Sequence, residues 1–85
     1  MNIKFTKEAW TDFEWFLNND KRIVQRIRKL LKDILRDPTA GIGKPERLKF
    51  QLSGYWARRI NKEHRLVYKV QEEAIYVISC RYHYE

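Results

Sequence analysis

The segment RLVYKVQEEAIYVISCRY, residues 65–82, decides the fold of this 85-residue chain. β-branched and aromatic residues dominate its two ends, residues 65–70 and 74–82, which is typical of strands. The three residues between them, Gln71-Glu72-Glu73, have a length that suits the loop of an antiparallel hairpin. Residues 55–61 have the same character and precede a similar short connection, so we expect a third antiparallel strand there.

The alternation of side chains along a strand assigns a face to each residue. In the strand over residues 65–70, one face carries Leu66, Tyr68 and Val70, and the other carries Arg65, Val67 and Lys69. In the strand over residues 74–82, one face carries Tyr76, Ile78, Cys80 and Tyr82, and the other carries Ile75, Val77, Ser79, Arg81 and His83.

Helical periodicity appears only before this sheet. Apolar residues at helical spacing predict a first helix over residues 7–18, with Thr6 as its N-cap, and residues 2–5 before it read as a short edge strand. A second helix begins after Asp20 and ends near Asp37, because Pro38 disfavours helical geometry in the residue before it. Its apolar stripe consists of Ile23, Ile27, Leu30, Leu31, Ile34 and Leu35.

The elements together predict an α+β fold in a single domain over residues 1–85. An N-terminal strand and a two-helix hairpin pack on one face of a small antiparallel β-sheet. The other face of the sheet stays open to a ligand.

Composition limits the class of protein. The chain has no apolar run of roughly 20 residues, so we expect no membrane span. Its N-terminus lacks a hydrophobic signal segment and its one cysteine, Cys80, fits a reducing compartment, so we expect a cytoplasmic protein. One cysteine and two histidines without an acidic cluster also predict no metal site and no cofactor.

The positive charge is concentrated in the middle of the chain. The net charge is +7, but residues 21–69 contain fifteen basic and four acidic residues, a net charge of +11. A block this basic indicates a polyanionic partner, either nucleic acid or an acidic protein, although a solvated basic surface has the same composition.

A set of reactive side chains accompanies this charge. Glu46 lies among lysines and arginines, Arg58 and Arg59 lie within a strand, Arg65 opens the next strand, and the chain ends in Cys-Arg-Tyr-His-Tyr-Glu. Each of these features alone is common in structural roles, as a solvated ion pair or a cross-strand contact. Together they supply what phosphodiester cleavage requires: a base, an acid, cations that bind phosphate and aromatic rings that stack on bases.

The sequence closely resembles the YoeB toxins of type II toxin–antitoxin systems, within the RelE/ParE superfamily. The most specific segments are Gly43-Lys44-Pro45-Glu46, residues 52–60 (LSGYWARRI), residues 63–68 (EHRLVY) and residues 80–84 (CRYHY). Glu85, which follows Tyr84, is a residue that close relatives often lack.

The resemblance implies a ribosome-dependent endoribonuclease that cuts mRNA in the A site by metal-independent acid–base catalysis. Glu46 matches the general base of the family, His83 its general acid, and Arg65 the residue that stabilises the transition state. Tyr84 matches the terminal aromatic residue that orients the substrate. Basic residues expected to bind the RNA are Lys44, Lys49, Arg58 and Arg59, and those expected to contact ribosomal RNA are Lys21, Arg22, Arg26, Arg28, Lys29 and Lys32.

The resemblance also implies partners. These are the 70S ribosome with its mRNA, an acidic antitoxin of the Phd/YefM type that covers the active site, and operator DNA bound only through the antitoxin complex. A homodimer is a further expectation.

Two alternatives belong to other functional classes. One is a toxin of the ParE type that inhibits gyrase without catalysis, against which the acid–base pair of Glu46 and His83 counts. The other is an RNA-binding module, for which the charge and the aromatic residues suffice.

Overall fold

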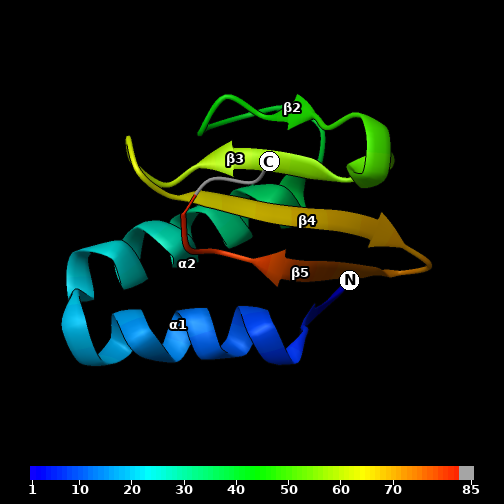
Figure 1. Ribbon diagram of the computed structural model, residues 1–85. Helices are drawn as coiled ribbons and strands as arrows, with labels where there is room; N and C mark the ends of the chain where they lie inside the picture. The colour runs from blue at the N-terminus through cyan, green and yellow to red at the C-terminus, as the bar shows by residue number, and fades with distance from the viewer. Residues whose placement is uncertain (83–85) are drawn as a thin grey trace.

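The computed structural model describes residues 1–82 of the chain. The elements follow the order β1 (Asn2–Phe5), α1 (Lys7–Asn19), α2 (Lys21–Arg36), β2 (Glu46–Arg47), a 3₁₀ turn η1 (Phe50–Leu52), β3 (Trp56–Arg59), β4 (Arg65–Gln71) and β5 (Ala74–Ser79). The predicted α+β class is confirmed, with α2 behind the central strands and α1 alongside β5 (Figure 1).

The sheet has five strands in the order β1-β5-β4-β3-β2. Strands β2 to β5 pair antiparallel, whereas β1 pairs parallel with β5. The N-terminal segment is therefore an edge strand, as predicted. At the opposite edge lies β2, a strand of two residues.

The two helices begin at the predicted caps. The Thr6 side chain accepts a hydrogen bond from the Ala9 backbone N–H at 3.1 Å. The Asp20 carboxylate accepts from the N–H groups of Arg22 and Ile23, so one residue ends α1 and caps α2.

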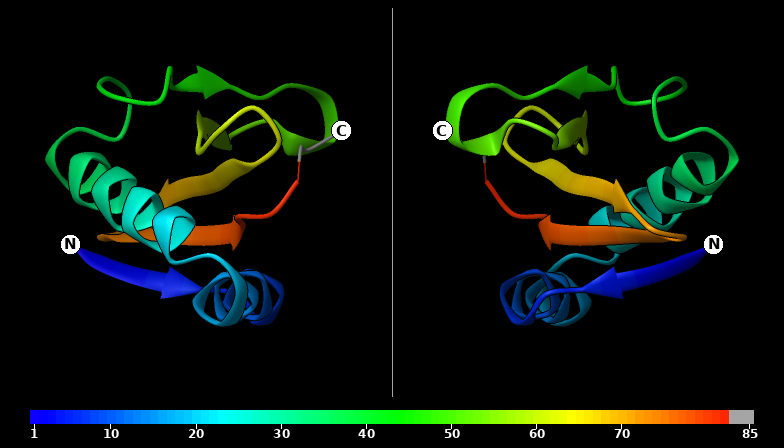
Figure 2. Two further views of the ribbon diagram at one scale, coloured as in Figure 1. Left: turned by 90° about the vertical axis from the view of Figure 1, so that its left-hand side faces the viewer. Right: turned by 90° about the vertical axis from the view of Figure 1, so that its right-hand side faces the viewer.

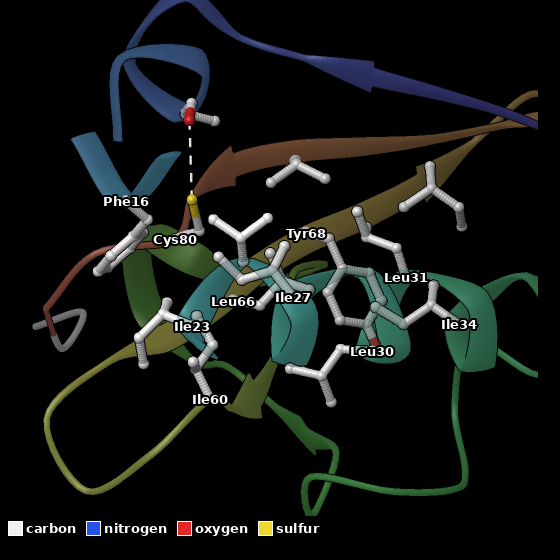
Figure 3. Close-up of a cluster of buried hydrophobic side chains, with 14 residues drawn as sticks. Phe16, Ile23, Ile27, Leu30, Leu31, Ile34, Ile60, Leu66, Tyr68 and Cys80 are labelled. Carbon is white, nitrogen blue, oxygen red and sulfur yellow. Dashed lines mark hydrogen bonds between the residues drawn. The ribbon is translucent and has the colours of Figure 1, made fainter. Parts of the chain in front are cut away.

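The main core lies between the helices and one face of the sheet. Figure 3 shows Ile27, Leu30 and Ile34 of α2 beside Leu66 and Tyr68 of β4. These side chains are all fully buried. The faces predicted for β4 are thus confirmed, whereas Leu35 of the predicted apolar stripe is 39% exposed.

The faces predicted for the end of β5 are wrong. Val67 pairs with Ser79 and Tyr68 with Val77, so Ile78 is an extra residue in β5. This bulge interrupts the alternation, because Ser79 now shares the face of Val67. Cys80 turns into the main core instead of sharing a face with Ile78, and burial raises the pKa of its thiol to about 12.

A smaller cluster covers part of the other face of the sheet. Leu48, Ala57 and Val67 are buried there, and Leu52, Tyr55 and Ile78 pack against them. The segment that carries β2 lies at the end of the molecule opposite α1 (Figure 2). This second face, away from the helices, is the one that presents the candidate site.

Candidate active site

Strand register brings three predicted site residues onto one face of the sheet. Glu46 pairs with Ala57, and Arg59 pairs with Arg65. Directly paired residues point to the same side, and so do residues two apart in a strand, so Glu46, Arg59 and Arg65 share the face of Ala57. Adjacent strands lie about 4.8 Å apart. A carboxylate and two guanidinium groups therefore lie across three neighbouring strands.

The loop before β2 depends on one glycine. Gly43 has a φ of +79°, and a Cβ at this position would lie 2.8 Å from a Leu30 methyl carbon and 3.2 Å from the Arg59 carbonyl. The Gly43 carbonyl accepts a hydrogen bond from the Arg59 N–H at 2.7 Å. Only glycine allows this close approach without strain. The contact holds the loop against β3, three residues before Glu46.

A basic depression adjoins this face. It has a volume of about 400 Å³ and is lined by Arg26, Arg59, Ile60, Asn61, Lys62 and Arg65, which include four cations and no carboxylate. The Arg65 guanidinium donates to the carbonyls of Asn61 and His64, at 2.7 and 3.1 Å. Arg26 of α2 donates to the Arg59 carbonyl at 3.2 Å. The depression can bind an anion of the size of a phosphate.

A second hollow follows Glu46. Residues 46–52 line a space of about 260 Å³, and Lys49 and Phe50 are exposed at its rim. Lys44, also exposed, precedes Glu46 and has a φ of +50°. The predicted cations Lys44, Lys49 and Arg59 thus all reach solvent near Glu46 or Arg65.

Arg58 does not belong to this surface, and its predicted contact with RNA is wrong. Its side chain is completely buried on the helical side of β3. The guanidinium donates to Asp33, to the Tyr68 hydroxyl and to the carbonyls of Asp37, Ala40 and Ile42. These bonds tie the loop after α2 to the sheet. The sequence indicated that Arg58 and Arg59 differ, because adjacent residues of a strand face opposite sides of the sheet.

The Asp33 carboxylate is the ionic partner of Arg58. The two groups are 2.6 Å apart, and Asp33 also accepts from Arg36 at 3.0 Å. The hydrogen bond from Arg58, together with those from the Ile42 N–H and Arg36, lowers the pKa of Asp33 to about 2.

The cations predicted to contact ribosomal RNA follow α2. A broad groove of about 840 Å³ along this helix is lined by Arg22, Arg26, Arg28, Lys29 and Lys32, with Gln25 and the apolar Ile3, Leu31 and Leu35. Lys21 is exposed at the first turn of the helix. Arg26 is half-buried, whereas the other cations of the groove are exposed, because its guanidinium donates to the Arg59 carbonyl. Arg26 also lines the basic depression and so connects it to this groove.

The predicted acid and terminal aromatic residue, His83 and Tyr84, lie outside the described residues. Among residues 1–82, no three His, Cys, Asp or Glu side chains form a group that could hold a metal ion. In the same range, neither helix is long and apolar enough to cross a membrane.

Comparison with known proteins identifies the family. A family model described as the YoeB-like toxin of bacterial type II toxin–antitoxin systems matches residues 5–84. The chain is 56% identical over 85 residues to toxin YoeB of Synechocystis sp., covering 100% of this chain and 99% of the relative. It is 49% identical over 84 residues to toxin YoeB of Escherichia coli K12, covering 99% and 100%. The chain belongs to the YoeB toxin family.

Solved structures agree with this assignment. A YoeB/ParE toxin from Agrobacterium tumefaciens superposes with a TM-score of 0.97 at 44% identity, over 99% of this chain and 100% of that one. The YoeB dimer and a YoeB–YefM complex, both from Staphylococcus aureus, superpose with TM-scores of 0.92 and 0.91 at 52% and 50% identity, each over 99% of this chain and 98% of the other. The YoeB fold predicted from the sequence is confirmed.

Three residues without a predicted role, His64, Arg81 and Tyr82, come together beside Arg65 in the structure. The Tyr82 N–H donates to His64 Nδ1 at 2.7 Å, and the Tyr82 carbonyl accepts from the Arg65 N–H at 3.1 Å. The sequence shows only that His64 precedes Arg65 and that Tyr82 precedes His83; the burial of His64 is visible in the structure alone.

Proposed function

We propose that this YoeB-family toxin is an endoribonuclease that binds the ribosome and cuts mRNA in the A site. The observation that carries the proposal is the register of β2, β3 and β4, which puts Glu46, Arg59 and Arg65 on one open face. A carboxylate beside phosphate-binding cations suits proton transfer at a phosphodiester.

Each site residue has a role in the proposed reaction. The Glu46 carboxylate accepts the proton of the RNA 2′-hydroxyl, whose oxygen forms a bond to phosphorus as the bond to the 5′-oxygen breaks. His83 donates a proton to that leaving oxygen. Arg65 neutralises the charge on the phosphorane, Lys44, Lys49 and Arg59 bind the RNA backbone, and Tyr84 orients the substrate. The products are a 2′,3′-cyclic phosphate and a 5′-hydroxyl, and no metal ion takes part.

We also propose the partners that this surface fits. An acidic segment of a YefM-type antitoxin complements the basic face that includes Arg59 and Arg65 and so blocks the site. The basic groove of α2 binds ribosomal RNA. A second copy of the chain forms a homodimer, and operator DNA is bound only through the antitoxin complex. We place the active toxin in the cytoplasm, where ribosomes translate mRNA.

Cleavage of mRNA on purified 70S ribosomes tests the enzymatic proposal. Wild-type protein should cut within the A-site codon, and Glu46→Gln and His83→Ala should each reduce the rate about 10²- to 10⁴-fold. Cleavage should persist when EDTA chelates free metal ions on ribosomes first stabilised by cross-linking. Near-wild-type rates for either variant would show that this assignment of acid and base is wrong.

Two control assays separate the alternative functions. Inhibition of plasmid relaxation by gyrase, without mRNA cleavage, would indicate a toxin of the ParE type. Ribosome binding without cleavage would indicate an RNA-binding module.

A further inference from the structure

Two backbone hydrogen bonds fix Tyr82, the residue directly before His83. Its N–H donates to His64 Nδ1 at 2.7 Å, and its carbonyl accepts from the Arg65 N–H at 3.1 Å. Both partners lie where β4 begins, 17 to 18 residues away in sequence. Tyr82 has a φ of +65°, a conformation that a bulky residue adopts only when its surroundings impose it.

His64 is itself held on several sides. Only 6% of the residue is exposed, and its ring contacts the rings of Phe16 and Tyr82, with centroid distances of 5.0 and 5.5 Å. Its Nε2 lies 3.1 Å from a carboxylate oxygen of Glu63. Because Nδ1 accepts from an N–H group, it carries no proton, so the ring proton of neutral His64 is on Nε2 and points to Glu63.

Hydrogen bonds within the loop hold the segment that carries His64. The Asn61 side-chain oxygen accepts from the N–H groups of Glu63 and His64, at 2.8 and 2.7 Å. The Ile60 N–H donates to the His64 carbonyl at 3.0 Å and so closes the turn. The same loop receives the Arg65 guanidinium on the carbonyls of Asn61 and His64. One short loop therefore holds both Arg65 and the chain at Tyr82.

A second contact holds the segment from the side of α1. The Arg81 guanidinium carbon lies 3.7 Å from the centre of the Trp15 ring, and its Nη2 donates to the Tyr82 hydroxyl at 3.0 Å. Cation–π contacts of this kind are stronger when the cation is partly desolvated, and Arg81 is half-buried. The residues just before His83 are therefore anchored to both α1 and the β3–β4 loop.

We infer that His64 is a positioning residue, which uses Nδ1 to fix the main chain beside Arg65 at Tyr82, the residue directly before His83 in the sequence. The inference rests on the proposed function, because it gives His83 the role of the acid. His64 contacts no substrate in this account. Its effect on the reaction comes through the placement of the proposed acid, His83, relative to Arg65. The two groups must act on one phosphate, and a misplacement of 1 Å can cost about 10²-fold in rate.

The histidine suits this task at neutral pH. Burial lowers the pKa of His64, and Arg81 acts in the same direction, whereas Glu63, Asp12 and Asp20 raise it in part. The neutral ring therefore prevails at neutral pH and leaves Nδ1 free to accept the Tyr82 N–H.

The decisive comparison uses two substitutions at this one position. His64→Leu keeps much of the volume but removes the acceptor, whereas His64→Asn places an oxygen near the position of Nδ1. In steady-state assays on 70S ribosomes, we expect His64→Leu to lower kcat about 10- to 100-fold with KM within twofold. His64→Asn should recover most of this loss. Ile34→Val, a change of buried volume in the main core away from the site, should lower Tm without changing kcat at 25 °C.

Hydrogen exchange at the Tyr82 amide provides a readout that does not depend on catalysis. NMR should show faster exchange of this amide in His64→Leu and recovery in His64→Asn. If His64→Leu does not fold, His64→Gln takes its place, because its amide lies one carbon further along the side chain and should not reach the Tyr82 N–H.

The outcomes separate this inference from the proposed function. Absence of cleavage by wild-type protein would overturn the function and, with it, the catalytic part of the inference. If wild type cleaves, two results would overturn the inference alone: an unchanged kcat in His64→Leu, or equal losses in His64→Leu and His64→Asn. Unchanged exchange at the Tyr82 amide in His64→Leu would overturn the anchor itself, whether or not the protein cuts RNA.

Discussion

Arg58 and Arg59 are adjacent in β3, and their environments differ completely. Arg58 is buried and makes five hydrogen bonds. Three go to carbonyls of the segment between α2 and β2, one goes to Asp33 within α2, and one goes to the Tyr68 hydroxyl. Arg59 is exposed on the opposite face, beside Arg65. The first arginine ties the loop that leads to Glu46 to the sheet, and the second reaches solvent, where we propose that it binds RNA.

The first prediction compares the same substitution at these two positions. Arg58→Met should lower the free energy of unfolding by about 3 kcal/mol, because Asp33 and three carbonyls lose a buried donor. Arg59→Met should change stability by less than about 0.5 kcal/mol, since the side chain is exposed, but should slow mRNA cleavage. Urea unfolding and cleavage on ribosomes measure both effects. Similar stabilities for the two variants would contradict the structural role of Arg58.

The second prediction concerns the acid stability that Asp33 provides. The pKa of Asp33 is about 2 in the folded protein, below its usual value of 3.8, so the unfolded chain binds this proton first as pH falls. The stabilising contribution is complete above about pH 5 and is lost progressively as the pH falls toward 2. Urea unfolding midpoints should therefore fall less steeply over this range in Asp33→Asn than in wild type. Parallel slopes would show that this carboxylate does not contribute.

The two arginines also show what the sequence could predict at this scale. Residue types and the family resemblance located Glu46, Lys49, Arg59 and Arg65, which the structure brings near one another. They did not separate Arg58 from Arg59. Alternation puts the two side chains on opposite faces, but it does not say which face offers acceptors to an arginine, because those of Arg58 come from Asp33 and from a loop whose path is a property of the tertiary structure. The Tyr82–His64 contact was hidden for the same reason.

At the scale of elements, predictability followed the strength of the repeating pattern. Helix α2 has sixteen residues, and its apolar stripe repeats at helical spacing along most of that length. Its bounds could therefore be predicted closely. Strand β2 has two residues, too few for a pattern, and exists only through its pairing with β3. The bulge at Ile78 left no mark in the residue types, so alternation placed Cys80 on the wrong face.

The third prediction tests the basic face of α2. Charge reversal to glutamate at the exposed positions Arg22, Arg28, Lys29 and Lys32 should weaken ribosome binding and reduce its salt slope by about 0.7–0.9 for each phosphate that the helix no longer neutralises. Arg26 is left unchanged because it donates to the Arg59 carbonyl near the site. The fold should survive, since the buried stripe lies on the other side of the helix.

The matched control for α2 is Lys7→Glu, a charge reversal at an exposed position in the first turn of α1. It should leave the affinity for ribosomes unchanged. Filter binding or fluorescence anisotropy at several salt concentrations measures the slope for each variant. If the quadruple variant keeps the salt dependence of wild-type ribosome binding, the cations of the α2 groove contact solvent and not ribosomal RNA.

At the scale of the whole molecule, the distribution of charge opposes the compact state. Residues 21–69 carry a net charge of +11, and the fold gathers many of these cations around the α2 groove and the basic depression. Like charges held close together repel, which lowers the stability of the free protein. A polyanion that covers the sheet face relieves this repulsion and binds only the folded state.

The last prediction follows from this balance. A synthetic peptide with the acidic segment of the proposed YefM-type antitoxin should inhibit cleavage and raise Tm together. At one hundred times its Kd it adds about 2.7 kcal/mol of stability, which corresponds to about 10–20 °C for a domain of this size. Arg65→Ala should weaken peptide binding as well as cleavage, because the same guanidinium meets both anions. Arg28→Ala, on the α2 groove, should bind the peptide as wild type does. Isothermal titration calorimetry measures the peptide affinity of each variant. Equal affinities for Arg65→Ala and Arg28→Ala, with inhibition that does not compete with RNA, would show that the antitoxin binds a different surface. Neutralisation would then act from a distance and not by covering the site.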